Sequence, residues 1–214
     1  WLKKKNYALK VSYEPNSDFS LLRNGDYSKE YEVFKGLEMI KSSYPIWARQ
    51  HLEKLTKLIL DKGYSLNIEE DILPKLKAIK KEIKLKHTED LAFNFNCRVY
   101  NKYVKSEKNL ELLKGIPIYA RAASYYNHLL ITNKLLGKYS KIMEGNKIKY
   151  YHPAENKHEF DIFAYAPSAF PDEIALPIDY DKQFFALIVE PVNRQLKALG
   201  MNELIINSTV KIKS

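Results

Sequence analysis

Alternating apolar and polar residues at the start of the chain predict β-structure. Residues 1–13 alternate in this way around Tyr7, Leu9, Val11 and Tyr13, as expected for a strand with one buried face. A turn-rich segment containing Asn24-Gly25 follows, and the next apolar stretch is strand-like again up to an interruption at Gly36. Residues 1–36 therefore predict strands that do not make a complete sheet by themselves.

Beyond this segment the apolar residues recur every three or four positions, which is the spacing of amphipathic helices. Four such segments are predicted to be helical: 45–63, 68–86, 117–138 and 178–200. Two further segments, "EGNKIKYYHP" and "EFDIFAYAP", predict short strands, whereas the stretch from 87 to 116 has no regular pattern. The fold class predicted is α+β, mainly helical, with short strands.

Prolines and polar residues predict how these helices begin, bend and end. Pro45 suits a first helical turn, and Gly63 stands where a C-terminal cap would fall. Pro74 is expected in the first turn of the second helix, and Pro191 is expected to kink the last one.

The acidic residues and histidines suggest no catalytic or metal centre. Asp179 and Asp181 could hold Mg²⁺ if they lay on a strand, but they precede a long helix and are better explained as its N-cap. His152 and His158 do not have the spacing of a zinc site, and Cys97 is the single cysteine. We therefore predict no catalytic residue, no metal ligand and no cofactor in this chain.

Composition favours a polyanionic partner in a reducing compartment. The net charge is +9, from 35 Lys and Arg against 26 Asp and Glu, and the chain has 16 Tyr and 9 Phe. This balance favours nucleic acid as the partner, although a lysine-rich surface alone would give the same count. One cysteine excludes an internal disulfide, and no apolar run reaches the ~18 residues that a membrane span needs. We expect a cytoplasmic protein without a membrane partner, or one in the host-cell cytoplasm if the gene is viral.

Four clusters combine cations with hydroxyl, amide or aromatic groups, which are suited to contacts with a phosphate backbone. They occur in "KKKNY", "KSSYP", "YARAASYYN" and "EGNKIKY". The candidate DNA-binding residues are Lys4, Lys5, Tyr7, Lys41, Ser42, Ser43, Arg121, Asn127, Lys147 and Lys149.

In order along the chain, these segments resemble the C-terminal part of family B DNA polymerases, especially those of tailed bacteriophages. "KKKNYAL" is similar to the K-K-x-Y palm strand that grips the new duplex, and "KGLEMIKSSYP" to the entry into the thumb. "IPIYARAASYYN", "EGNKIKYY" and "DIFAYAP" resemble successive thumb elements. Tyr119 stands where the family usually has His, and Ala186 and Glu190 where it commonly has Lys.

The resemblance implies that residues 1–36 end a palm domain and that residues 37–214 form a mainly α-helical thumb. The chain would be the C-terminal fragment of a DNA-directed DNA polymerase that uses Mg²⁺ in its complete form. The fragment alone would clasp double-stranded primer–template DNA without extending it. Its partners would be that duplex, the remainder of the polymerase and, if a further tail continues, a sliding clamp.

Two alternatives stay open at this stage. The chain could be a separately encoded, non-catalytic DNA-binding subunit of a split polymerase, or a helical protein-interaction scaffold with incidental charge. For Arg121, which we expect to contact phosphate from the first turn of a helix, the alternative is an intramolecular salt bridge.

Overall fold

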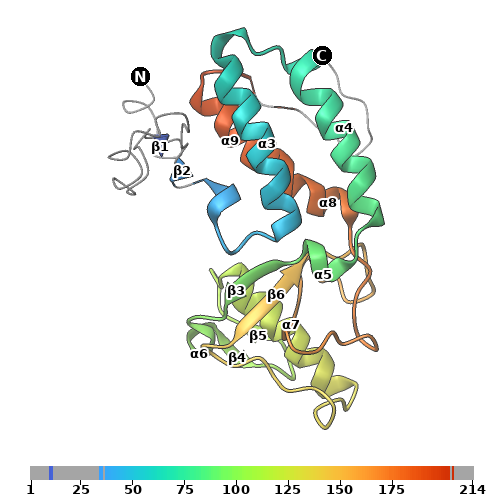
Figure 1. Ribbon diagram of the computed structural model, residues 1–214. Helices are drawn as coiled ribbons and strands as arrows, with labels where there is room; N and C mark the ends of the chain where they lie inside the picture. The colour runs from blue at the N-terminus through green and yellow to red at the C-terminus, as the bar shows by residue number, and fades with distance from the viewer. Residues whose placement is uncertain (1–9, 12–33, 36, 203, 205–214) are drawn as a thin grey trace, which may run out of the picture.

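The computed structural model describes residues 10–11, 34–35, 37–202 and 204 (Figure 1). Lys4, Lys5, Tyr7 and most of the predicted palm segment lie outside these residues. Helix accounts for 49% and strand for 11%, which confirms the predicted α+β class with helix predominating. Within the N-terminal segment, β1 (Lys10–Val11) pairs antiparallel with β2 (Phe34–Lys35).

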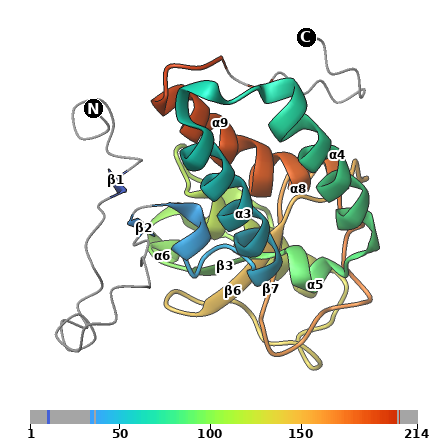
Figure 2. The same cartoon turned by 45° about the horizontal axis from the view of Figure 1, so that its top comes forward.

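Helices from both ends of the described chain pack together as one half of the molecule, with the main sheet as the other half (Figures 1 and 2). This helical half contains 3₁₀ turns at Glu38–Ile40, Gly63–Ser65 and Ile83–Leu85, π-helical turns at Ile68–Ile72 and Phe185–Val189, and the helices α3 (Ile46–Lys62), α4 (Leu73–Glu82), α8 (Tyr180–Phe184) and α9 (Glu190–Ala198). None of the helices in the part of the chain that the structure describes is long and apolar enough to cross a membrane.

The predicted caps are present, but two predicted helices are less regular than expected. Pro45 and Gly63 flank α3, and Gly63 adopts a positive φ of 51°. Segment 68–86 begins with the π-helical turn before Pro74, and the last helix contains a second π turn just before Pro191. A proline ring clashes with the carbonyl four residues earlier, and a wider turn relieves this clash.

The other half is built on a three-stranded antiparallel sheet in the order β3-β6-β7. Its elements are α5 (Thr88–Leu91), β3 (Phe93–Asn96), α6 (Tyr100–Tyr103), β4 (Val104–Ser106), β5 (Glu111–Leu112), α7 (Ile118–Thr132), β6 (Lys147–Tyr151) and β7 (Phe163–Tyr165). β4 and β5 form a separate two-stranded sheet, while α7 packs against β7 and β6. The strands β6 and β7 and the helix α7 were predicted; β3, which forms an edge of the main sheet, was not.

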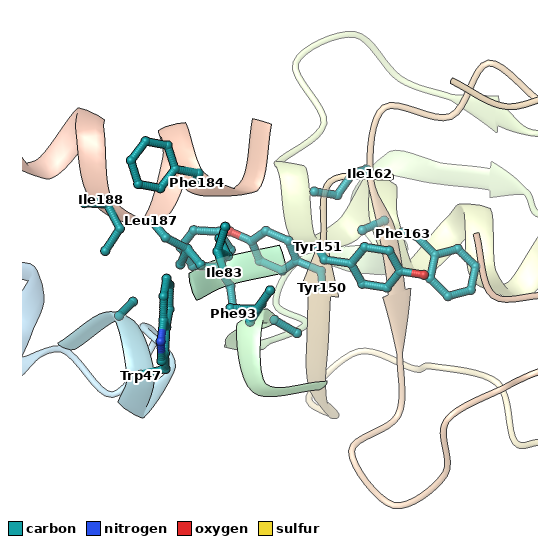
Figure 3. Close-up of a cluster of buried hydrophobic side chains, with 14 of the residues drawn as sticks. Trp47, Ile83, Phe93, Tyr150, Tyr151, Ile162, Phe163, Phe184, Leu187 and Ile188 are labelled. Atoms are coloured by element: carbon teal, nitrogen blue, oxygen red, sulfur yellow. The ribbon is translucent and has the colours of Figure 1, made fainter. Parts of the chain in front are cut away.

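One apolar core runs from the helices into the sheet (Figure 3). Phe184 and Trp47 come from the helical half, while Phe93, Tyr150 and Phe163 come from the strands, and all five side chains are at most 8% exposed. The Phe93 ring stacks on Tyr150 with ring centroids 5.1 Å apart. Because aromatic rings bury large apolar areas, this shared core fixes the sheet relative to the helices.

A buried amide supplies polar contacts between the same two halves. Gln183, on α8, is fully buried; its Nε2 donates to the Leu91 carbonyl at 2.6 Å and its Oε1 accepts from the His152 N–H at 3.0 Å. The two backbone groups belong to α5 and to the residue that follows β6. The contact therefore satisfies polar groups that the apolar core would otherwise leave unpaired.

Replacing Gln183 with Leu tests this contact. The change keeps the apolar volume but leaves one carbonyl and one N–H buried without partners, so we expect a loss of about 2–5 kcal/mol in the free energy of unfolding. Gln50→Leu, at an exposed position of α3, is the matched control and should change it by less than ~0.5 kcal/mol. Equal effects of the two substitutions in urea unfolding would contradict the assigned role.

Candidate nucleic-acid interface

The segment just before α3 lies along the outer edge of β3. The backbone N–H of Asn94 donates to the Ser43 carbonyl at 2.8 Å, and the Asn94 side-chain amide reaches the Ser42 carbonyl at 3.5 Å. The edge strand thus has a backbone partner at this point, and two serine hydroxyls are held beside the sheet.

Four polar side chains share one face of β3 and β6 at the end where the two strands carry Asn94, Asn96, Lys147 and Lys149. Asn94 pairs with Lys149 and Asn96 pairs with Lys147 in the antiparallel register, and directly paired residues point to the same face. Two amides and two ammonium groups therefore share one face beside the serine segment. Such groups donate hydrogen bonds to phosphate oxygens without distinguishing base sequence.

A groove of about 530 Å³ opens at this edge. We call it the basic groove; its lining residues are Ser42, Ser43, Asn94, Phe95, Asn96, Arg98, Lys147, Ile148 and Pro167. Among the described residues that line it, none is acidic, whereas Arg98 and Lys147 are cationic and exposed. Neither cation forms a salt bridge within the part of the chain that the structure describes, so both can receive an anion.

The backbone is strained directly beside Arg98. Val99 has φ 48° and ψ 27°, in the left-handed region that a β-branched residue rarely adopts. The turn closes against the hairpin before β6, where Cys97 and Asn146 pair through the backbone at 2.8 Å. Such a backbone conformation costs ~1–3 kcal/mol, and residues that adopt it cluster at functional sites. This observation supports a functional role for the turn at Arg98 and Val99.

The structure brings together only some of the predicted DNA-binding residues. Ser42, Ser43 and Lys147 line the basic groove, although they are far apart in the sequence. Lys149 lies over the neighbouring hollow, where two acidic residues also line the surface and its Nζ donates to the Glu89 carbonyl at 3.1 Å. Lys41 pairs with Glu38 at 3.1 Å while its side chain stays 45% exposed.

Arg121 makes the intramolecular contact that the sequence left as the alternative. It lies in the first turn of α7, and its Nη2 is 2.6 Å from the Asp161 carboxylate. Its side chain is 31% exposed, compared with 56% for Asp161. This guanidinium is thus partly neutralised, and a phosphate at this position would compete with Asp161.

The prediction for Asn127 was wrong, because its side chain is completely buried. Its Nδ2 donates to the Glu107 carboxylate and to the Ile142 carbonyl, each at 2.8 Å, and its Oδ1 accepts from the Ile142 N–H at 2.8 Å. Tyr100 donates to the same carboxylate at 2.7 Å, and Lys141 lies 2.6 Å from it. Asn127 therefore holds the interior together and cannot touch a duplex.

Of the two carboxylates predicted to cap the last helix, only that of Asp179 does so, because the carboxylate of Asp181 pairs with Lys80 at 3.0 Å. Asp179 Oδ1 accepts from the N–H groups of Asp181 and Lys182 at 3.0 and 2.9 Å. Across the residues that the structure describes, no cluster of three or more His, Cys, Asp or Glu side chains could hold a metal ion.

Arg98, Asn94 and Asn96 were missed by the sequence analysis. The signal was present in "FNFN", whose strict alternation is that of a strand with one polar face. Because the stretch is only four residues long and lies within an irregular region, its period was overlooked, and the cation just after it was not assigned to a surface.

Comparison with known proteins adds no family to these observations. No protein-family model matches the chain, and a search of curated proteins found no significant match.

Replacing Asn127 with Ala tests its structural role. The substitution leaves the Ile142 backbone groups and the Tyr100 hydroxyl short of partners in the interior, so we expect a loss of about 3 kcal/mol or more in the free energy of unfolding. Asn101→Ala, at an exposed position whose side chain makes no hydrogen bond to other described residues, is the control. An Asn127 variant as stable as the wild type would contradict the burial described here.

Glu107 should make part of the stability pH-dependent. Burial raises the pKa of Glu107, but hydrogen bonds from Lys141, Tyr100 and Asn127 outweigh this effect and leave the pKa below its ordinary value. A carboxyl whose pKa is lower in the folded state stabilises the fold above its unfolded pKa, and this contribution is lost as the pH falls through the folded pKa.

Thermal unfolding of the wild type and Glu107→Gln checks this effect. The wild type should melt at the higher temperature at neutral pH, and the difference in midpoint should shrink below about pH 4.5, the ordinary range of a glutamate. Other carboxyls titrate in both proteins and cancel in the difference. A difference that stays constant down to acid pH would show that the charge of Glu107 is not involved.

Proposed function

We propose that this chain is the thumb region of a family B DNA polymerase of the tailed-bacteriophage type, and that it grips the primer–template duplex during DNA replication. Nucleotidyl transfer and the catalytic Mg²⁺ would belong to the remainder of the complete polymerase. The contribution of this chain would be to hold duplex DNA through its phosphates.

The observation that carries the proposal is the convergence of three motif segments on one groove. Ser42 and Ser43 come from "KSSYP", Lys147 from "EGNKIK" and Pro167 from "DIFAYAP", and all four line the basic groove. These segments supported the resemblance through their order in the sequence alone. Their meeting at one cationic surface is what a shared DNA-contacting role requires.

Chemistry and geometry support backbone rather than base recognition. The basic groove offers ammonium, guanidinium, hydroxyl and amide donors but no acidic lining residue. Phosphate oxygens accept from all four kinds of donor, and such contacts fix the position of a duplex without selecting its sequence. Binding of this kind releases counterions and weakens linearly with log salt concentration.

Duplex binding by the Arg98→Ala and Lys147→Ala variants tests the proposal. Each variant should bind a short duplex more weakly by roughly 1–2 kcal/mol, the range for a charge-assisted hydrogen bond. The slope of log affinity against log salt should become shallower by about one phosphate contact for each variant, whatever the base sequence. Thermal midpoints should not move, because both side chains are exposed.

The control is Lys77→Ala, which removes the same charge from an exposed position on α4 in the helical half. Equal weakening by this variant would mean that net charge, and not the basic groove, determines affinity. Absence of salt-dependent duplex binding even at low salt would refute the proposal and favour the interaction scaffold.

A further inference from the structure

We infer that Glu144 is a positioning residue for the basic groove: its carboxylate holds the strained turn that carries Arg98 in the form that presents this cation to phosphate. The inference rests on the proposed duplex-binding function, and it adds a residue that acts on the duplex only through Arg98. An acidic side chain would thus favour the binding of a polyanion, which is the opposite of what its charge alone predicts.

The Glu144 carboxylate contacts the turn just beyond Arg98. Its Oε2 accepts from the backbone N–H of Asn101 at 2.9 Å, although the two residues are 43 positions apart in the sequence. Asn101 lies in the first turn of α6, where N–H groups have no partner within the helix, so the carboxylate satisfies one of them. A hydrogen bond to an ionised acceptor is roughly twice as strong as one between neutral groups.

Backbone hydrogen bonds fasten the same turn on the other side of Arg98. Cys97, directly before it, donates its N–H to the Asn146 carbonyl at 2.8 Å, and its carbonyl accepts from the Gly145 N–H at 2.6 Å. The turn is therefore tied, before and after Arg98, to the segment that leads into Lys147 at the start of β6. The two cations of the basic groove thus stand on segments that hold each other.

The strain at Val99 is the reason that this turn needs to be held. The β-branched side chain disfavours the left-handed conformation with φ 48°, so a turn released from its contacts would return to negative φ. Because Val99 lies between Arg98 and Asn101, that change would alter the direction in which Arg98 leaves the turn. The hydrogen bond from Asn101 to Glu144 opposes this relaxation and keeps Arg98 at the groove.

The test compares Glu144→Ala and Glu144→Gln in fluorescence-anisotropy titrations with a blunt hairpin duplex. Glu144→Ala should weaken binding by roughly 2- to 30-fold, the upper limit being the loss expected for Arg98→Ala. If the carboxylate acted by its charge alone, the same substitution would strengthen binding, because it removes a negative charge from the neighbourhood of phosphate. Glu144→Gln keeps an oxygen that can accept from Asn101, so it should bind at least as tightly as the wild type.

Double variants show whether Glu144 acts through Arg98. In an Arg98→Ala background, Glu144→Ala should no longer weaken binding, whereas in a Lys147→Ala background the weakening should persist. Equal weakening in both backgrounds would overturn the inference, since a general loss of stability would act on both alike. The matched control is Glu89→Ala, which removes an exposed carboxylate from the neighbouring hollow and should bind the duplex as tightly as the wild type or more tightly.

NMR spectroscopy gives a readout that does not depend on DNA. Backbone chemical shifts of Val99 should indicate a positive φ in the wild type and in Glu144→Gln, and a negative φ in Glu144→Ala; a positive φ in all three would count against the inference. Salt-dependent duplex binding by the wild type, with unchanged or tighter binding by Glu144→Ala, would refute the positioning role and leave the proposed function standing. Failure of the wild type to bind the duplex at low salt would refute the proposed function as well.

Discussion

The packing of strand aromatics against the helices is the interaction on which the rest of this structure depends. Phe93 stacks on Tyr150, and its ring also meets the edge of Tyr44, which lies between the serine segment and α3. This packing holds β3 against the start of the helical half, where the Asn94 N–H donates to the Ser43 carbonyl at 2.8 Å. The basic groove therefore depends on the core. Asn94, which lines the groove, directly follows Phe93, which is buried in the core.

Helices were the most predictable part of the fold, because their apolar stripes are long enough for the period to be counted. The buried positions of α3 and α4, such as Leu55 and Ile79, follow that stripe closely. The buried side of α7 was less predictable, since it contains Ala, Ser and Asn as well as Leu. Composition alone could not distinguish the interior Asn127 from an exposed amide, because the difference lies in Glu107 and Tyr100, which come from other segments.

The positions of Lys and Arg in the sequence were a poor guide to which cations are available at the site. Lys147 has no carboxylate partner within the described chain. Arg121 pairs with Asp161, which is distant in the sequence, and Lys41 pairs with Glu38, three residues before it. Whether a cation is available depends on these tertiary neighbours, and a single sequence does not give them. Arg98 is the opposite case. It stands alone in the sequence, and its place on a cationic surface becomes evident only when the fold brings it and Lys147 to the same groove.

The order of strands also has a consequence for how the protein folds. β3 and β6 are hydrogen-bonded neighbours, but α6, β4, β5 and α7 lie between them in the sequence. Closing this long loop costs conformational entropy before any ladder bond is gained, whereas α3 and α4 can form from local contacts. The basic groove would then be among the last surfaces to assemble, and a nascent chain would bring Lys147 to the serine segment only after β6 has been synthesised and has joined the sheet.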